Sequence, residues 1–420
     1  MEVGFFGLGK LGLATALSVE ARGHRVCGFD PSPEVAAILA ARRVPYREEG
    51  VDAALAGSSL ELASEAEVVR RCELVFVAIQ TPHAPGYEGV TRMPAEPADF
   101  DYSHLCRGLA RLFAEIERLG RPRVVAVVST VLPGTLRRLA LPLAGKNAKV
   151  CYNPSFVAMG TALRDLSRPE FVLVGADDAG AADAVEAFHR TLHDAPVHRS
   201  GIESAELAKV LYNTYISTKI AFANTAMELC HGTPGADVDA VLGALALGSR
   251  RIVSPAYLSG GMGDGGGCHP RDNMALRHLS RRLSLSYDWF DAVMSQRERQ
   301  TGWLASLVEK HAAGRPVWIL GKAFKAGSDL TAGSPALLLR GLLAERGLRA
   351  GMWDPHVPGG EAPPAGVPLC YFIGTRHPEF LFFEFNPGSV VLDPWRYLPP
   401  RPGVELVPIG VGPRVEGAGG

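Results

Sequence analysis

The sequence predicts an α/β protein in which two doubly wound, Rossmann-like domains are joined by a central domain with a long helix. Three observations support this fold class. Short apolar runs alternate with helical segments near both ends of the chain, a glycine-rich turn directly follows the first run, and one long helical pattern occupies the middle. We expect domains over residues 1–200, 201–300 and 301–420.

Composition and charge narrow the function classes before any motif is considered. The chain has 420 residues, of which 47% are hydrophobic and 21% charged, as is usual for a globular protein. The formal net charge of -1 gives no basic field for a nucleic acid or an anionic membrane. No apolar run is long enough to span a bilayer. We therefore expect neither class of partner.

The cysteines indicate a reducing compartment. They show neither CxxC nor Cys/His spacing and their number is odd, so we expect free thiols, no disulfide framework and no metal site. The segment MEVGFFGLGKLG lacks the cationic start of a signal peptide, which favours a cytoplasmic protein. The seven cysteines are at positions 27, 72, 106, 151, 230, 268 and 370.

The first apolar run, residues 2–6, is expected to be a strand that ends at a GxGxxG turn. Gly7 permits the tight turn, Gly9 lets a pyrophosphate approach the backbone, and Gly12 lets the following helix pack on its strand. Free N–H groups at the helix N-terminus, around Lys10 and Leu11, favour the anion. A bare GxGxxG is weak evidence, but here both strand and helix are in place.

A second run, residues 24–30, ends in Asp30, 23 residues after Gly7. A carboxylate there accepts hydrogen bonds from a ribose diol and repels a 2′-phosphate, so NAD is favoured over NADP. Further strands are expected in 72–82, 123–135 and 171–177, and ligands bind beyond the carboxyl ends of such strands. Thr81 and Thr130 at these ends are therefore candidates. A helix N-cap is the alternative role for Thr130.

The middle of the chain reads as one helix over about residues 204–230. Lys209 and Asn213 are four residues apart and share a face, with Asn224 three turns further on. Lys209 is either a solvated surface group or a partly buried functional amine. Beyond this helix, three consecutive glycines precede Cys268, which leaves its thiol open to a ligand.

A second doubly wound pattern begins at Arg315. The order is a strand in 315–321, Lys325, a Ser334-Pro335 helix start, a strand that ends at Asp354, and two further strands close to Thr375 and Arg396. Two such units with an accessible thiol between them suggest an enzyme that handles NAD on one side and a second ligand on the other.

With these residues identified, the chain resembles the UDP-glucose/GDP-mannose 6-dehydrogenase family over nearly its whole length. The matching segments, in family order, are GLGKLG, VFVAIQTP, STVLPGT, NPSF, AELAKVLYNTY, AYLSGGMGDGGGCHPRDNMAL, GKAFKAGSDLTAGSP, MWDPHV, GTRHPEF and VVLDPWRYL. The resemblance implies an NAD-binding first domain, a central dimerisation domain that carries the catalytic cysteine loop, and a C-terminal nucleotide-sugar-binding domain. It also implies a homodimer through the long helix.

The resemblance further implies a reaction and residue roles. Such enzymes oxidise a primary alcohol of a nucleotide sugar to a carboxylate with two NAD molecules, through a thiohemiacetal and a thioester on Cys268. Lys209 and Asn213 would stabilise the developing alkoxide, Asp272 would orient water or act as base, and Thr130 would assist through water. Arg271 would contact the cofactor. The implied substrate contacts are Ser155, Phe156, Lys209, Asn213, Tyr257, Gly265, Lys325 and Arg396, although Arg396 is alternatively a surface group.

Four departures from the family pattern leave a second reading open. Ser155 and Met159 stand where carboxylates are expected, Ala332 stands where arginine is usual, and His269 replaces an apolar residue. Serine is not a general base at neutral pH, so a specialised relative that acts on an atypical nucleotide sugar, stops at the aldehyde or uses NAD transiently for epimerisation is the alternative. A third reading is a non-enzymatic nucleotide-binding relative.

Overall fold

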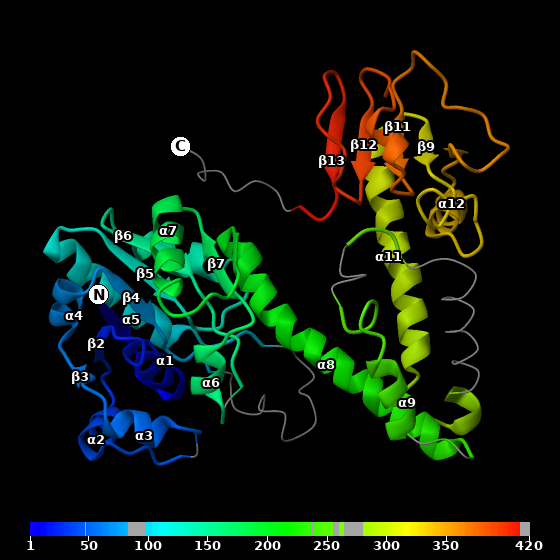
Figure 1. Cartoon of the computed structure of the whole chain (residues 1–420). Coiled ribbons are helices and arrows are strands. Elements are labelled where there is room, and N and C mark those ends of the chain that lie inside the picture. The colour runs from blue at the N-terminus through cyan, green and yellow to red at the C-terminus, as the bar shows by residue number, and fades with distance from the viewer. Residues whose placement is uncertain are drawn as a thin grey trace. The chain divides into compact units, whose positions relative to one another are not determined.

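The computed structural model describes residues 1–46, 48–82, 98–158, 160–234, 236, 238–254, 260–263 and 280–411. It divides into two compact units, Met1–Ser217 and Thr218–Gly420. Both units are α/β (Figure 1), which confirms the expected fold class. The helix α8 (Ile202–Gly232) begins in the first unit and ends in the second. The three-domain division at residues 200 and 300 stays a prediction.

The first unit contains an eight-stranded sheet with the order β3-β2-β1-β4-β5-β6-β7-β8. All neighbouring strands pair in parallel except β6 and β7, which are antiparallel. The switch point between β1 and β4 lies next to the glycine-rich turn, where doubly wound sheets bind ligands. The strands are β1 (Glu2–Phe6), β2 (Arg25–Phe29), β3 (Glu61–Leu62), β4 (Leu74–Val77), β5 (Arg123–Val127), β6 (Ala148–Tyr152), β7 (Val172–Ala176) and β8 (Val197–Ser200).

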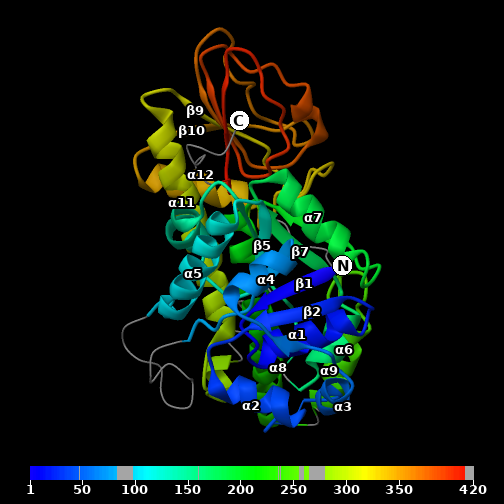
Figure 2. The ribbon, with the colours of Figure 1, turned by 90° about the vertical axis from the view of Figure 1, so that its left-hand side faces the viewer.

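Helices cover both faces of this sheet (Figure 2). One apolar core lies between the sheet and helices α1, α2, α3 and α7, and a second lies between the opposite face and α4, α5 and the start of α8. The helices are α1 (Lys10–Glu20), α2 (Pro33–Ala41), α3 (Val51–Ala56), α4 (Glu65–Arg71), α5 (Ser103–Leu119), α6 (Ala162–Ser167) and α7 (Ala179–His189), with short helical turns at Leu136–Ala140 and Leu141–Leu143.

The turn after β1 has the geometry that its glycines predict. Gly7 has a φ of 92°, a conformation that side chains with a Cβ rarely adopt. A Cβ on Gly12 would lie 2.0 Å from the Gly7 carbonyl oxygen, so only glycine lets α1 start this close to β1. A Cβ on Gly9 would contact nothing within 4 Å, which leaves open space in front of the helix N-terminus.

The second unit contains a five-stranded, all-parallel sheet with the order β10-β9-β11-β12-β13. Residues of the helices α11 and α12 form an apolar core with the strands β9–β12. Ser334 caps α12 by accepting a hydrogen bond from the Ala336 amide, as its Ser-Pro start predicts. The elements are α9 (Val238–Ala246), α11 (Trp289–Ala312), β9 (Val317–Leu320), α12 (Pro335–Glu345), β10 (Ala350–Trp353), β11 (Cys370–Ile373), a helical turn at Pro378–Leu381, β12 (Val390–Asp393) and β13 (Glu405–Pro408).

An aspartate after the second strand of each doubly wound pattern secures the preceding turn. In the first unit, Asp30 accepts a hydrogen bond from the Leu8 amide at 2.7 Å. In the second, Asp354 accepts from the amides of Lys322 and Ala323 at 2.5 and 2.9 Å. In the first unit α1 starts at Lys10, three residues after Gly7, whereas in the second α12 starts at Pro335, fourteen residues after Gly321.

The strands expected from apolar runs are present, as is the long helix. The sequence interpretation did not identify β3, β6, β8 or β13 as strands. Among the residues that the structure describes, no helix combines the length and the apolar character needed to cross a membrane.

Candidate functional site

Lys209 is a buried amine of α8 within the first unit. The residue is 9% exposed, and its Nζ donates a hydrogen bond to the Ser155 carbonyl oxygen at 2.7 Å. Nζ also lies 4.8 Å from the centre of the Phe156 ring, a distance at which the ring face attracts a cation. Burial lowers the pKa of Lys209 below the usual lysine range. Of the two roles open for Lys209, this geometry favours the partly buried one.

Phe156, beside this amine, belongs to a cluster of three aromatic side chains. Phe156 packs against Phe171 and Tyr212 with ring centroids 4.6 and 4.7 Å apart. Their apolar surface excludes water from one side of Lys209, and this strengthens the electrostatic effect of the ammonium on a neighbouring ligand.

Lys209 and Asn213 line one pocket of about 450 Å3, as their four-residue spacing predicts. Arg168 adds a second cation to its wall, and Asp165 and Glu170 add carboxylates. An ammonium and an amide on the same helix face can donate hydrogen bonds to an oxygen that gains negative charge. The pocket therefore suits a polar ligand with such an oxygen.

Glu206, one turn before Lys209, joins α8 to the segment that follows β5. Its carboxylate is fully buried and accepts hydrogen bonds from the amides of Gly134 and Leu136 at 2.6 and 2.9 Å. Burial raises the pKa of Glu206. The sequence interpretation did not single out this residue, although a glutamate three residues before a candidate lysine shares its helix face.

Thr81 and Thr130 meet at the carboxyl ends of β4 and β5. The Thr81 hydroxyl donates a hydrogen bond to the Thr130 carbonyl oxygen at 2.6 Å. The alternative that Thr130 is a helix N-cap is wrong, because the next helical turn begins at Leu136 and Thr135 precedes it. Thr130 thus lies at the ligand-binding edge of the sheet without a capping role.

The residues of the β1–α1 turn fit a dinucleotide. The start of α1 has no side-chain cap, so the first-turn amides, those of Lys10 and Leu11 among them, remain available to a phosphate. The Lys10 ammonium lies 5.0 Å from the centre of the Tyr46 ring. Asp30 accepts from the Leu8 and Ser32 amides and has further lone pairs for a ribose diol.

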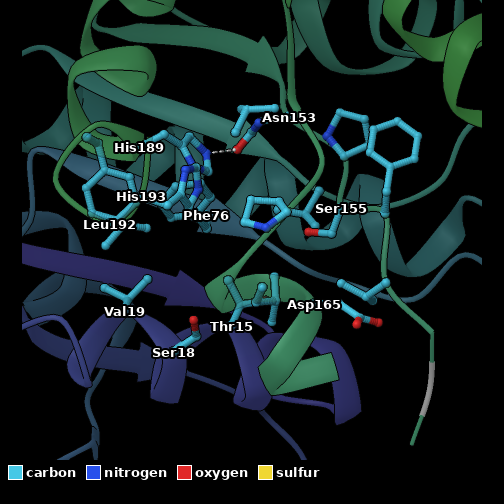
Figure 3. A pocket seen from close by; sticks show the side chains of 18 of the residues that line it. Thr15, Ser18, Val19, Phe76, Asn153, Ser155, Asp165, His189, Leu192 and His193 are labelled. Carbon is cyan, nitrogen blue, oxygen red and sulfur yellow. Dashed lines mark hydrogen bonds between the residues drawn. The ribbon is translucent and has the colours of Figure 1, made fainter. Parts of the chain in front are cut away.

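The Ser155 side chain lines a second, smaller cavity between α1, α6 and α7 (Figure 3). Its backbone carbonyl accepts from Lys209, but its side chain is not among those that line the Lys209–Asn213 pocket. His189 and His193 line the same cavity as Ser155. Sequence reasoning passed over both imidazoles, whose four-residue spacing at a helix end was the available signal.

The candidates in the second unit have different surroundings. Lys325 is exposed. The Arg396 guanidinium donates hydrogen bonds to the carbonyls of Pro394, Ile409 and Gly260 at 2.5, 2.8 and 2.7 Å. Arg396 therefore holds backbone segments together, including one that precedes Cys268 in the sequence.

Several predicted residues lie outside the described part of the chain. These are Tyr257, Gly265, Cys268, His269, Arg271 and Asp272, together with Met159. Their predicted roles stay predictions.

Within the described ranges, one group of side chains has metal-like spacing: His356, His377 and Glu379. His377 pairs with Asp354 through Nε2 at 3.2 Å, and its Nδ1 accepts from the Gly327 amide. His356 pairs with Glu379 at 2.8 Å. Both nitrogens of His377 are thus used by the protein itself, so this group does not revise the prediction of no metal site.

Comparison with known proteins identifies relatives that match most of the chain. The NAD-binding domain of the UDP-glucose/GDP-mannose dehydrogenase family matches residues 1–193, and the central domain of that family matches residues 203–298. GDP-mannose 6-dehydrogenase of Pseudomonas putida is 29% identical over 371 residues, which are 85% of this chain and 81% of that protein. UDP-glucose 6-dehydrogenase of Rickettsia bellii is 27% identical over 368 residues, 84% and 81% of the two chains.

A solved ternary complex of GDP-mannose dehydrogenase from Pseudomonas aeruginosa shares the fold. It superposes with a TM-score of 0.84 at 23% identity and covers 97% of this chain and 99% of its own. The two family domains together match more than half of the residues, and the turn after β1 fits a dinucleotide. The chain therefore belongs to the UDP-glucose/GDP-mannose dehydrogenase family of nucleotide-sugar dehydrogenases, and its cofactor is NAD.

Proposed function

We propose that this protein oxidises the primary alcohol of a nucleotide sugar to the uronic acid, with Cys268 as the covalent nucleophile. The observation that carries the proposal is the buried Lys209 ammonium, which lines a pocket with Asn213 on the same helix face. Both groups can donate to an alkoxide formed from the substrate hydroxyl. Lys209 is desolvated but held by one carbonyl, so it keeps donors for a ligand.

The overall reaction balances as one alcohol, two NAD⁺ and one water giving one carboxylate, two NADH and three protons. The residues of the β1–α1 turn would hold two NAD molecules in succession, and each would accept one hydride. Between the two hydride transfers, the Cys268 sulfur bonds to the aldehyde carbon, which keeps the aldehyde on the protein. Water then attacks the thioester, the C–S bond breaks and the thiol is regenerated, with Asp272 as the proposed base and Thr130 assisting through water.

The remaining residues are assigned to the two ligands. We propose that Gly7, Gly9, Gly12, Asp30, Thr81 and Arg271 contact NAD, and that Phe156, Tyr257, Gly265 and Lys325 contact the nucleotide sugar. Arg396 acts through the backbone of Gly260 in this proposal, because its guanidinium already bonds three carbonyls.

A direct assay tests this function. The purified protein is incubated with NAD and GDP-mannose, UDP-glucose and other UDP- and GDP-sugars, and both NADH and product mass are measured. Two NADH per sugar and an acid product are expected, and the responding sugar identifies the substrate. No NADH with any member of the panel contradicts the proposal.

A two-electron reaction is the second candidate, favoured by one observation. The Ser155 hydroxyl lies in the cavity with His189, so position 155 supplies no carboxylate to the Lys209–Asn213 pocket. In the same assay, one NADH per sugar with a product two mass units lighter identifies this reaction, whereas an isomer without net NADH identifies transient use of NAD for epimerisation.

We also propose a cytoplasmic homodimer that associates through α8. The six cysteines in the described ranges are all free, which supports a reducing compartment. Apolar side chains that are 42–52% exposed along α8, Leu211, Ile216, Phe222 and Met227, support association. Light scattering checks this, and a monomer mass would contradict it.

A further inference from the structure

The cavity that contains Ser155 includes a buried imidazole nitrogen without a hydrogen-bond partner. Asn153 Nδ2 donates to the Leu173 carbonyl at 2.9 Å, so its Oδ1 is the atom that faces His189 Nε2, also at 2.9 Å. Because Oδ1 is an acceptor, His189 carries its proton on Nε2. Its Nδ1 is then a bare lone pair, buried and without a partner among the described residues.

His193, one helical turn later, places a second buried ring nitrogen beside the cavity. Its amide bonds to the His189 carbonyl at 3.2 Å, which continues the helical turn, and the two ring centroids are 5.5 Å apart. Its Nδ1 is also buried and has no partner among the described residues. Two unpaired polar nitrogens beside one cavity require an explanation, since buried polar groups almost always have partners.

The cavity is small and most of its wall is apolar, with a few polar groups from α1, α7 and the Ser155 segment. Its volume of about 60 Å3 has room for about four to six waters, at 10–15 Å3 for each. His189 and His193 lie on one side, with Thr15 and Ser18 of α1 on the other (Figure 3). Ser155 adds a third hydroxyl to the wall. These few polar groups are where water would be bound in an otherwise largely apolar cavity.

Other occupants fit less well. A metal ion needs about three or more protein ligands, and no third His, Cys or carboxylate joins the two imidazoles in the described residues. Asp165, on the cavity wall, already accepts from the Ala158 amide and the Thr161 hydroxyl. An apolar ligand would leave both Nδ1 atoms unpaired.

We propose that this cavity is a water-binding site, in which water donates a hydrogen bond to Nδ1 of His189, also bonds to Nδ1 of His193, and thereby fixes the Asn153–Val157 loop. The connection has three steps. Water bonds to His189, and His189 Nε2 donates a hydrogen bond to Asn153 Oδ1. Two residues after Asn153, the Ser155 carbonyl oxygen accepts a hydrogen bond from Lys209. His189 is then a positioning residue for the loop. The inference does not depend on the reaction that the protein catalyses.

Crystallography with xenon tests the occupant. In a high-resolution crystal structure we expect water within hydrogen-bond distance of both Nδ1 atoms and no xenon in a pressurised crystal, because xenon enters dry apolar cavities. Xenon without water in the cavity would overturn the proposal, as would a metal ion between the imidazoles. Nitrogen NMR of histidine-labelled protein should show His189 protonated on Nε2, with its Nδ1 signal shifted in the direction of a hydrogen-bonded acceptor.

Two variants test the effect on the loop. In His189→Gln, the amide can donate to Asn153 and accept from water, whereas His189→Leu does neither. We expect amide hydrogen exchange in residues 155–158 at least about tenfold faster in the leucine variant and close to wild type in the glutamine variant, since only the former loses the hydrogen-bond chain. Equal exchange in both would overturn the role of His189.

A milder change covers the case in which His189→Leu does not fold. His193→Leu removes one nitrogen that bonds to water and leaves the Asn153–His189 bond intact, so it should lower water occupancy and raise exchange by a smaller factor. His198→Leu, on the exposed part of β8, is the matched control and should change neither. Full water occupancy in His193→Leu would contradict the proposed site.

Discussion

The Glu206 carboxylate on α8 accepts a hydrogen bond from the Gly134 amide at 2.6 Å, and it does so with no exposure to solvent. The second oxygen accepts from Leu136. These bonds hold the segment that follows β5 against the helix that carries Lys209. A change at Glu206 therefore affects both the stability of the first unit and the geometry of the candidate site.

We predict that Glu206→Ala lowers the free energy of unfolding by about 3 kcal/mol, because the amides of Gly134 and Leu136 lose an acceptor that is itself fully buried. Glu206→Gln should cost less, since its amide oxygen still accepts from one of them. Urea unfolding measures both values. Glu298→Ala, at an exposed position of α11, is the control and should change stability by less than about 0.5 kcal/mol. A loss of less than about 0.5 kcal/mol for Glu206→Ala as well would refute the role given to these hydrogen bonds.

Lys209→Met should lower kcat by about a hundredfold or more on the substrate found in the panel assay, because one donor to the developing alkoxide is lost. The apolar stem is kept, so the fold should survive. Steady-state NADH formation measures the effect, with the exposed Lys310→Met as control. An unchanged kcat for Lys209→Met would remove Lys209 from the mechanism.

Asp30→Asn should raise the affinity for NADP relative to NAD by about tenfold. The amide oxygen can still accept from the Leu8 amide, while the negative charge that repels a 2′-phosphate is gone. Quenching of protein fluorescence by each dinucleotide measures the ratio without turnover. Glu34→Gln, exposed in the first turn of α2, should leave the ratio unchanged. A similar ratio in both variants would argue against a ribose contact by Asp30.

Arg396→Ala should release the backbone near Gly260, because three carbonyl bonds disappear together. We expect amide exchange in residues 260–263 to rise about tenfold or more. Arg376→Ala, a change of another exposed arginine in the same unit, is the control. If exchange stays the same while KM for the nucleotide sugar rises, Arg396 binds the substrate instead.

Acid should destabilise the first unit through His189. Burial lowers its pKa from 6.5 to about 3, so between these values the unfolded chain binds a proton that the folded chain does not. The contribution of His189 to the free energy of unfolding is fully present above pH 6.5. It decreases as the pH drops towards 3, by at most about 1.4 kcal/mol per pH unit. Unfolding of wild type and His189→Gln across this range measures the difference in slope, which should be flatter in the variant. Equal slopes would contradict the assignment.

Much of the fold was predictable because apolar runs and glycines carry local signals. The strands β1, β4 and β12 are continuous apolar runs, and the turn at Gly7 needs a positive φ that glycine supplies. β8 and β13 were missed because alternating or polar residues at a sheet edge give no such run. The reversed direction of β7 also has no local signal, since it depends on pairing with β6.

The site was predictable only in part. The spacing of Lys209 and Asn213 on one helix face indicated that they act together, and both line one pocket. The role of Glu206 and the cavity at His189 depend on contacts between residues 36 to 72 positions apart, which no local pattern encodes. Thr130 is an example. Its hydroxyl was compatible with a helix N-cap, but the next helical turn begins only at Leu136, six residues later.

The aspartates at the ends of β2 and β10 bond to similar turns, but the two turns differ in the backbone amides that remain free for a ligand. Asp354 already occupies the amides of Lys322 and Ala323, and α12 begins too far along the chain to direct its N-terminus at that turn. The pyrophosphate of a dinucleotide would therefore find free backbone amides at a helix N-terminus after β1 but not after β9. Calorimetric titration should accordingly saturate at one equivalent of dinucleotide per polypeptide, although the chain contains two sheets of the same architecture.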